Sequence, residues 1–291
     1  MTRLLLSAFL ILSMAYTAAA QGIFARYAPI ENNLFENPQP LEGPWARAPA
    51  NHAQFIAQTV TPPMTTDTPT DALEVRAVHN SEWLAVYVKW EDTERNEHID
   101  GNVQSDAVAI SFPLKGHTTS PFMGDFDTPV EIIHWKAVWQ KDVENGYADI
   151  TDFHPNLYAE AYHGSMTVMP HELAKILEKD EARLAMPAIE LNNPVSRPDR
   201  IHPVEQLMAE GYTGTITSLD NASARAWGIH KNGSWHVVFT RPLDTGDPNM
   251  HAMSPGEETV INFAVWDGQR GDVGARKSYT MWMQFKLENE R

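Results

Sequence analysis

The amino-acid sequence predicts a mainly β protein, an antiparallel β-sandwich with a few short helices in its connections. Several short segments alternate side chains between two faces and are rich in β-branched and aromatic residues, which is typical of strands in a packed sheet. Turn-forming residues separate these segments, and only two stretches show helical spacing. A chain of 291 residues with this pattern fits one large all-β domain.

The first twenty residues predict a cleaved signal peptide. Arg3 supplies a positive start, Leu4–Tyr16 is apolar, and Ala18-Ala19-Ala20 has the small side chains of a cleavage site. The apolar run is short for a transmembrane helix, which needs about 20 residues. We therefore expect residues 21–291 to be the mature single domain, exported to the periplasm.

The composition excludes several classes of function. The chain has no cysteine, so it cannot form disulfides, cysteine-ligated iron–sulfur clusters or a c-type haem attachment. Its formal net charge of −16 argues against binding nucleic acid or an anionic membrane surface. The sequence also lacks a glycine-rich phosphate loop and the motifs of hydrolases and zinc proteases.

The expected strands follow in chain order. Residues 21–80 are rich in Pro, Asn and Thr and predict irregular coil with an edge strand or two. Glu82–Trp90 is the clearest strand, with Leu84, Val86 and Val88 on one face. Further strands are expected at Ala107–Phe112, Val130–Trp139, Thr213–Ser218, Ser234–Arg241, Thr259–Trp266 and Ser278–Leu287.

Two segments predict helices. Pro170–Leu184 has leucine and isoleucine at helical spacing, and Pro203–Glu210 begins with proline and is followed by Gly211. On the second helix Val204, Leu207 and Met208 would share one side, because Leu207 and Met208 lie three and four positions after Val204. That pattern by itself favours a place for Met208 in the core.

Methionine and histidine are the side chains with potential ligand chemistry. Met123 stands out because Pro121 and Gly124 place it in a turn-rich loop between two strong strands, where an apolar thioether needs a surface that buries it. A single histidine within a strand, such as His134, is expected to be partly buried and hydrogen-bonded. An alternative function is copper binding by Met250, His251 and Met253, since thioether and imidazole suit copper.

A second alternative is a carbohydrate-binding module. Sandwiches of immunoglobulin-like or carbohydrate-binding-module-like form often bind sugars, and nine tryptophans could provide a stacking platform.

Several motifs resemble the haem-b gamma subunits of periplasmic molybdenum oxidoreductases, the family of ethylbenzene dehydrogenase, dimethylsulfide dehydrogenase, chlorate reductase and selenate reductase. The resemblance covers roughly Leu84 to Leu287. It is carried by Trp90-Glu91-Asp92-Thr93, Asp106-Ala107-Val108-Ala109-Ile110-Ser111-Phe112-Pro113, Pro121-Phe122-Met123-Gly124-Asp125, His134-Trp135-Lys136-Ala137-Val138-Trp139-Gln140, Pro203-Val204-Glu205 and Ala209-Glu210-Gly211-Tyr212-Thr213-Gly214-Thr215.

The resemblance implies a β-sandwich with one non-covalent haem b. The iron would take a methionine on one side and a lysine or second methionine on the other. Met123 matches the first ligand and Met208 the second, because the second ligand would precede Ala209-Glu210-Gly211. There is no lysine between Lys179 and Lys231. Lys136, inside a matching motif, and His202, close to Met208, are the reserve ligands.

The resemblance also implies a non-catalytic electron-transfer subunit. Two side-chain ligands would leave no open position on the iron, and neutral thioethers favour the ferrous state. The implied partners are a molybdenum-cofactor catalytic subunit and an iron–sulfur subunit. The acidic surface would suit a soluble basic c-type cytochrome as the periplasmic carrier.

Overall fold

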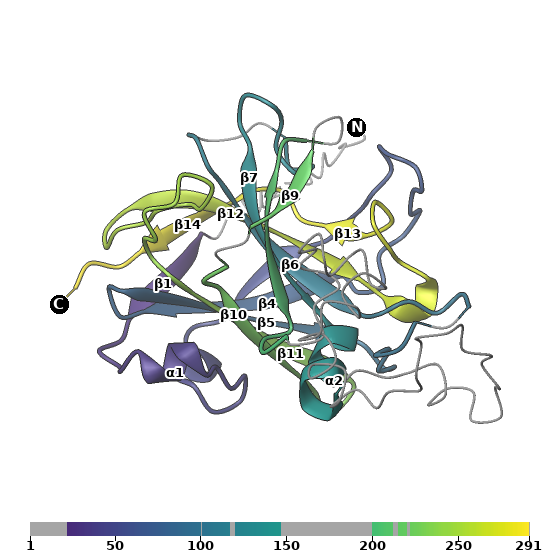
Figure 1. Ribbon diagram of the computed structural model, residues 1–291, viewed down its shortest axis with the longest axis horizontal. Helices are drawn as coiled ribbons and strands as arrows, with labels where there is room; N and C mark the ends of the chain where they lie inside the picture. Colours follow the sequence, from purple (N-terminus) through teal and green to yellow (C-terminus); the bar gives the residue numbers. More distant parts are fainter. Residues whose placement is uncertain are drawn as a thin grey trace, which may run out of the picture.

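The chain folds into a β-sandwich made from one continuous sheet that bends over itself (Figure 1). The computed structural model describes residues 22–99, 101–116, 120–146, 200–211, 215–219 and 222–290. The expected signal peptide and the expected helix Pro170–Leu184 lie outside these residues. The predicted fold class, mainly β with short helices in the connections, is confirmed.

The first layer contains one half of the sheet, and β2 belongs to it through its pairing with β4. Its neighbouring strands are β10 (Arg225–His230), β11 (Ser234–Pro242), β5 (Trp83–Glu91), β4 (Ala72–His79), β1 (Ile23–Tyr27) and β14 (Met283–Leu287), and β2 (Asn51–Gln54) pairs with β4. β1 runs parallel to both β14 and β4, so the sheet is mixed at this point.

The second layer is built on β12 (Glu258–Trp266), β6 (Ala107–Pro113) and β7 (Val130–Lys136). Beyond β7 lie β8 (Val204–Ala209) and β9 (Ile216–Ser218), while β13 (Ser278–Tyr279) pairs with β12 and with β3 (Ile56–Ala57).

β12 joins the two layers. Its first residues, from Glu258 to Ile261, pair with β14, and the rest, from Asn262 to Trp266, pair with β6.

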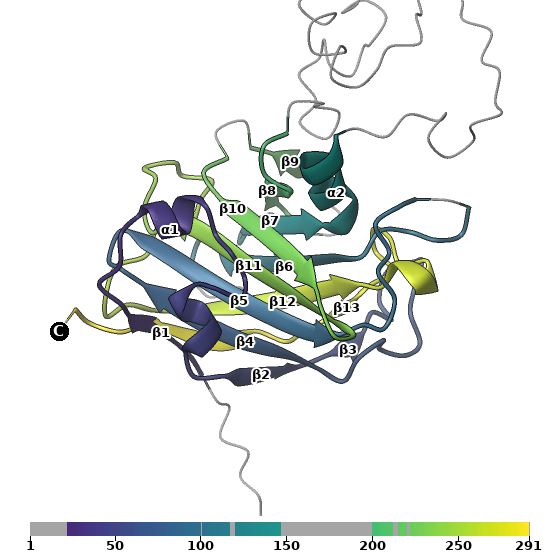
Figure 2. The same cartoon turned by 90° about the horizontal axis from the view of Figure 1, so that it is seen from below.

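The helices are short, and the first of them packs on the outer face of the first layer. α1 (Asn33–Glu36) lies against β5 and β11, and α2 (Ala137–Asn145) continues from β7 (Figure 2). Short 3-10 turns occupy Pro44–Arg47 and Gly268–Arg270. Within the described ranges no helix has the length and apolar character needed to cross a bilayer.

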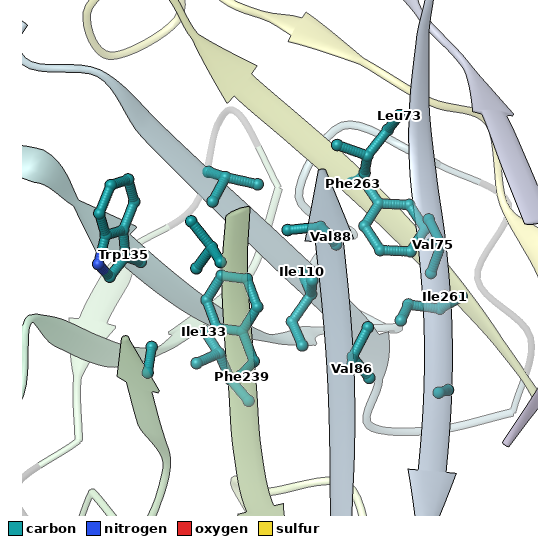
Figure 3. Packing of buried hydrophobic residues seen from close by; sticks show 14 of the residues in the cluster. Leu73, Val75, Val86, Val88, Ile110, Ile133, Trp135, Phe239, Ile261 and Phe263 are labelled. Carbon is teal, nitrogen blue, oxygen red and sulfur yellow. The ribbon is translucent and has the colours of Figure 1, made fainter. Parts of the chain in front are cut away.

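The main core lies between the layers, where alternate side chains of facing strands meet. Val86 and Val88 of β5 face the same apolar interior as Ile110 of β6 and Ile133 of β7 (Figure 3). Each of these four side chains is almost fully buried, as the two-residue period of the strands requires. The other face of the second layer, with Ala109 and Ile132, belongs to a separate apolar cluster.

Four expectations about the elements need correction. Residues 22–80 contain four strands, more than the edge strand or two expected, and β4 is central in its layer. The strand expected at Val130–Trp139 ends at Lys136, and α2 follows it: the Val138 amide donates to the Ser105 hydroxyl at 2.9 Å and no longer to a strand carbonyl. The strand expected at Ser278–Leu287 is divided into β13, which pairs with β12 and β3, and β14, which pairs with β12 and β1.

The fourth correction concerns Pro203–Glu210, which forms strand β8 and not a helix. Its backbone pairs with β7 on one side and with β9 on the other. Sheet pairing on both sides outweighs the local helical spacing, since tertiary context overrides weak propensity.

Candidate functional site

The candidate site is a cavity of about 340 Å³ on the outer face of the second layer. Because side chains alternate along each strand, every second residue of β6, β7, β8 and β12 points to this face. The wall is mainly apolar, and its residues include Ala109, Ile132, Leu207, Ile216, Ala264 and Trp266.

Met123 lines this cavity from the loop between β6 and β7. It is partly buried and packs against the apolar cluster that contains Ile132, Leu207 and Trp266. Its backbone has φ +65°, and the next residue, Gly124, has φ +69°. The loop thioether that sequence reasoning singled out therefore faces a mainly apolar wall.

Lys277 lines the same cavity from the residue before β13. Its Nζ lies 5.0 Å from the ring centroid of Trp266. Burial lowers the pKa of Lys277 to about 8, because a charged amine loses its hydration in apolar surroundings. Among the described residues no carboxylate forms an ion pair with it, and it shares the cavity wall with Met123.

His134 is the third side chain of interest in the wall. Its ring lies 4.7 Å from that of Trp266 and 5.8 Å from that of Trp139. The Nε2 atom is buried without a hydrogen-bond partner among the described residues. Burial, together with Lys136 and Lys277, holds the pKa of His134 well below its usual value. His134 is partly buried, as the sequence predicts, but its Nε2 lacks the expected hydrogen bond among the described residues.

The structure does not bring Met208 to this cavity. Met208 lies on β8 opposite Glu131, and its neighbour Leu207 takes the cavity-facing position. Successive side chains of a strand point to opposite faces, so Met208 points away from Met123.

The reserve residues Lys136 and His202 also lie outside the cavity wall as the structure describes it. The Nζ of Lys136 lies 4.5 Å from the Trp139 ring, and burial lowers its pKa. His202 precedes β8, and burial and Arg225 lower its pKa to about 4.

Lys277 is the residue that sequence reasoning missed. It lies directly before the segment predicted as the last strand, in Arg276-Lys277-Ser278. The feature of the sequence that could have indicated Lys277 is a lysine at a strand boundary, near aromatic residues. Its meaning depends on the pairing of β13 with β12, which the spacing of residues along the chain does not reveal.

The copper alternative finds no shared ligand set in the structure. The sulfur of Met250 accepts hydrogen bonds from the hydroxyls of Thr245 at 3.3 Å and Ser223 at 3.7 Å. Met253 packs in the main core, and the His251 ring stacks on Phe112 at 5.7 Å between centroids. Each of the three side chains thus has its own packing role.

The carbohydrate alternative has no exposed stacking platform. All nine tryptophans are among the described residues, and each is buried or half-buried. Trp90, Trp135 and Trp235 pack on one another in the main core.

Comparison with known proteins gives a family match and two relatives. A protein-family model described as ethylbenzene dehydrogenase matches residues 42–278. A protein of Haloferax mediterranei described as a respiratory nitrate reductase haem subunit is 22% identical over 265 residues, which is 90% of this chain and 73% of that protein. The chlorate reductase gamma subunit of Ideonella dechloratans is 24% identical over 221 residues, 75% of this chain and 66% of that protein.

Solved structures with low similarity are carbohydrate-related. A family 9 carbohydrate-binding module from Caldicellulosiruptor kristjanssonii, solved with glucose, is 10% identical with a TM-score of 0.41, over 92% of this chain and 96% of that one. A carbohydrate-binding protein from Bacteroides uniformis is 8% identical with a TM-score of 0.42, over 92% of this chain and all of that one.

Proposed function

Because the chain belongs to the ethylbenzene dehydrogenase family, we propose that it binds one non-covalent haem b and transfers electrons as a non-catalytic subunit of a periplasmic molybdenum oxidoreductase complex. The relatives described as a haem subunit of nitrate reductase and a gamma subunit of chlorate reductase support this proposal.

The observation that carries the proposal is the presence of Met123 and Lys277 on one mainly apolar cavity. A thioether and an amine are both ligands that a haem iron can take, and a non-covalent haem needs a dry, apolar surrounding. The residues present therefore fit the group. We assign Met123 and Lys277 as the axial ligands in place of the pair Met123 and Met208.

The bound haem would supply a one-electron redox couple. The protein's own part is to exclude water and to hold two ligands. Side chains such as Ile132, Leu207 and Trp266 provide the apolar wall. Two protein ligands leave no position for a small molecule on the iron, which suits electron transfer and disfavours oxygen binding.

The proposal extends to partners and location. Since the chain has no cysteine, any cysteine-ligated iron–sulfur cluster would belong to another subunit. We propose that the haem relays electrons between such an iron–sulfur subunit, next to a molybdenum-cofactor subunit, and a periplasmic carrier such as a c-type cytochrome. The signal-like first twenty residues support the periplasmic location.

The test is the reduced-minus-oxidised absorption spectrum of the purified protein. A haem b with two protein ligands gives a Soret band with sharp ferrous α and β bands that carbon monoxide does not change. Met123→Ala and Lys277→Ala should each open the iron to carbon monoxide. Met208→Ala is the matched control, because this methionine lies outside the cavity wall and should leave the spectrum unchanged.

Protein that takes up no haem would refute the proposed function. Haem that is bound but insensitive to both cavity substitutions, or sensitive to Met208→Ala, would refute the assignment of Met123 and Lys277 while leaving haem binding in place.

A further inference from the structure

The loop that carries Met123 has an unfavourable backbone conformation. Met123 has φ +65°, in the left-handed region that residues with a Cβ rarely occupy. Such a conformation persists only where surrounding contacts hold it, and it tends to occur at functional sites. The loop therefore needs identifiable restraints.

Three hydrogen bonds from distant segments supply those restraints. Each is donated to a backbone carbonyl of the loop, and the donors lie on β12, between β13 and β14, and directly after β8. The pairs are Asn262 Nδ2 to the Pro121 carbonyl at 3.0 Å, Trp282 Nε1 to the Ser120 carbonyl at 3.1 Å, and the Gly211 amide to the Met123 carbonyl at 2.8 Å.

The Asn262 bond has a defined direction. The Pro121 carbonyl can only accept, so the amide nitrogen of Asn262 must face it. On its other side, the Ser111 hydroxyl donates to Asn262 Oδ1 at 2.6 Å. Asn262 and Ser111 lie opposite each other on β12 and β6. The pairing of these strands therefore positions the Asn262 side chain, which in turn holds the Met123 loop.

Asn262 and Ser111 are also unusual for their position. Both are buried, with 6% and 7% of their surface exposed, and both line the cavity. Their neighbours on the same strands at this face are Ala264 and Ala109. Polar groups in an apolar wall cost free energy unless they are hydrogen-bonded. Asn262 and Ser111 bond to each other, and Asn262 also donates to the Pro121 carbonyl in the Met123 loop.

We propose that Asn262, oriented by Ser111, is a positioning residue for Met123. It holds the Pro121 carbonyl and so keeps the Met123 thioether turned into the cavity. This inference rests on the proposed function, in which Met123 binds the haem iron. Asn262 acts through the loop and takes no ligand role itself.

The test compares Asn262→Leu with Asn80→Leu in the full-length protein. Leucine keeps the branched shape of asparagine and removes both the donor to Pro121 and the acceptor for Ser111. Asn80 is the control. Its Nδ2 donates to the Ile30 carbonyl at 2.9 Å and to Asn32 Oδ1 at 2.7 Å, and its Oδ1 accepts from two backbone amides, but it does not line the cavity. Ser111→Ala is a milder second variant. It keeps the hydrogen bond from Asn262 to Pro121 and removes only the hydroxyl that orients the Asn262 amide.

Two measurements report on the positioning. In haem-free protein, amide hydrogen exchange of residues 122–125 should become about tenfold faster in Asn262→Leu, as expected for the loss of one buried hydrogen bond. In haem-loaded protein, the variant should react with carbon monoxide and have a lower reduction potential, because the thioether ligand is weakened. Ser111→Ala should change both in the same direction by less, and Asn80→Leu should change neither.

The proposal is overturned if Asn262→Leu keeps the wild-type hydrogen exchange, the wild-type reduction potential and the lack of reaction with carbon monoxide. It is also overturned if Asn80→Leu changes these properties as much as Asn262→Leu does. If the wild-type protein takes up no haem, the proposed function fails. The exchange measurement then still decides whether Asn262 holds the loop.

Discussion

Glu131 and Arg241 form an ion pair of 2.5 Å between the two layers, with 0% and 1% of their side chains exposed. The carboxylate accepts two further hydrogen bonds. Gln206 Nε2 donates to Oε1, and the His251 amide donates to Oε2 at 2.8 Å. A buried charge is tolerated only when it is paired and hydrogen-bonded, and this one is satisfied from three segments.

Glu131→Gln should therefore destabilise the protein by about 3–5 kcal/mol, because it leaves the Arg241 charge buried without a counter-charge. Urea unfolding of the two proteins measures the difference. The exposed pair Glu258–Lys286 provides the control, and Glu258→Gln should cost less than about 1 kcal/mol. Similar costs for both variants would contradict the prediction.

Asp92 should make stability depend on pH. Burial, together with the carboxylates of Asp106 and Asp267, raises the pKa of Asp92 to about 8. The native carboxyl then binds its proton more tightly than the unfolded chain does, so its contribution to stability is full below about pH 4 and is lost as the pH rises through about 8. The free energy of unfolding should fall by at most about 1.4 kcal/mol per pH unit for this proton.

Urea unfolding at several pH values between about 5 and 8 measures this slope. Asp92→Asn removes the titrating group and should flatten it. A slope that is the same in wild-type protein and in Asp92→Asn would show that other groups are responsible.

Gly211→Ala should weaken the haem site more than the fold. Gly211 has φ +84°, and an added Cβ would lie 2.9 Å from the Gly124 carbonyl oxygen and 3.0 Å from Asp125 Cα. Both contacts are with the Met123 loop, so the methyl group would push that loop away. We expect a loss of about 1–3 kcal/mol in stability and an iron that reacts with carbon monoxide. Unchanged haem spectra would argue against a close link between Gly211 and the Met123 loop.

Gly228→Ala should destabilise the main core by at least about 1–3 kcal/mol. An added Cβ would lie 2.3 Å from Trp135 Cζ2, and the Trp135 ring is held by its bond to Gln140 at 3.1 Å. Gly22→Ala is the control, because its nearest contact would be an ordinary 3.4 Å. Thermal unfolding compares the two, and equal midpoints would disprove the crowding.

The strands predicted accurately from the sequence are those in which side-chain character within the segment itself identifies a strand. Ala107–Phe112 and Thr259–Trp266 each lie within one residue of β6 and β12. β8 was not found, because its residues also fit a helix and only the pairing with β7 and β9 decides between the two. The loop position of Met123 follows from Pro121 and Gly124 next to it.

The other half of the site was beyond sequence reasoning. Lys277 is more than 150 residues from Met123 along the chain, and the two share a cavity because β13 pairs with β12 next to β6. That sheet order depends on long-range pairing. Asn262 and Ser111 face each other for the same reason.

The division of β12 between two layers has a thermodynamic consequence. The strand that lines the cavity also closes the main core, so the stability of the cavity wall is coupled to that of the whole sandwich. A ligand that binds only the native cavity would then protect the whole domain, by an amount that grows with the logarithm of its concentration relative to its dissociation constant. The midpoint of global unfolding should accordingly rise with the concentration of the free cofactor.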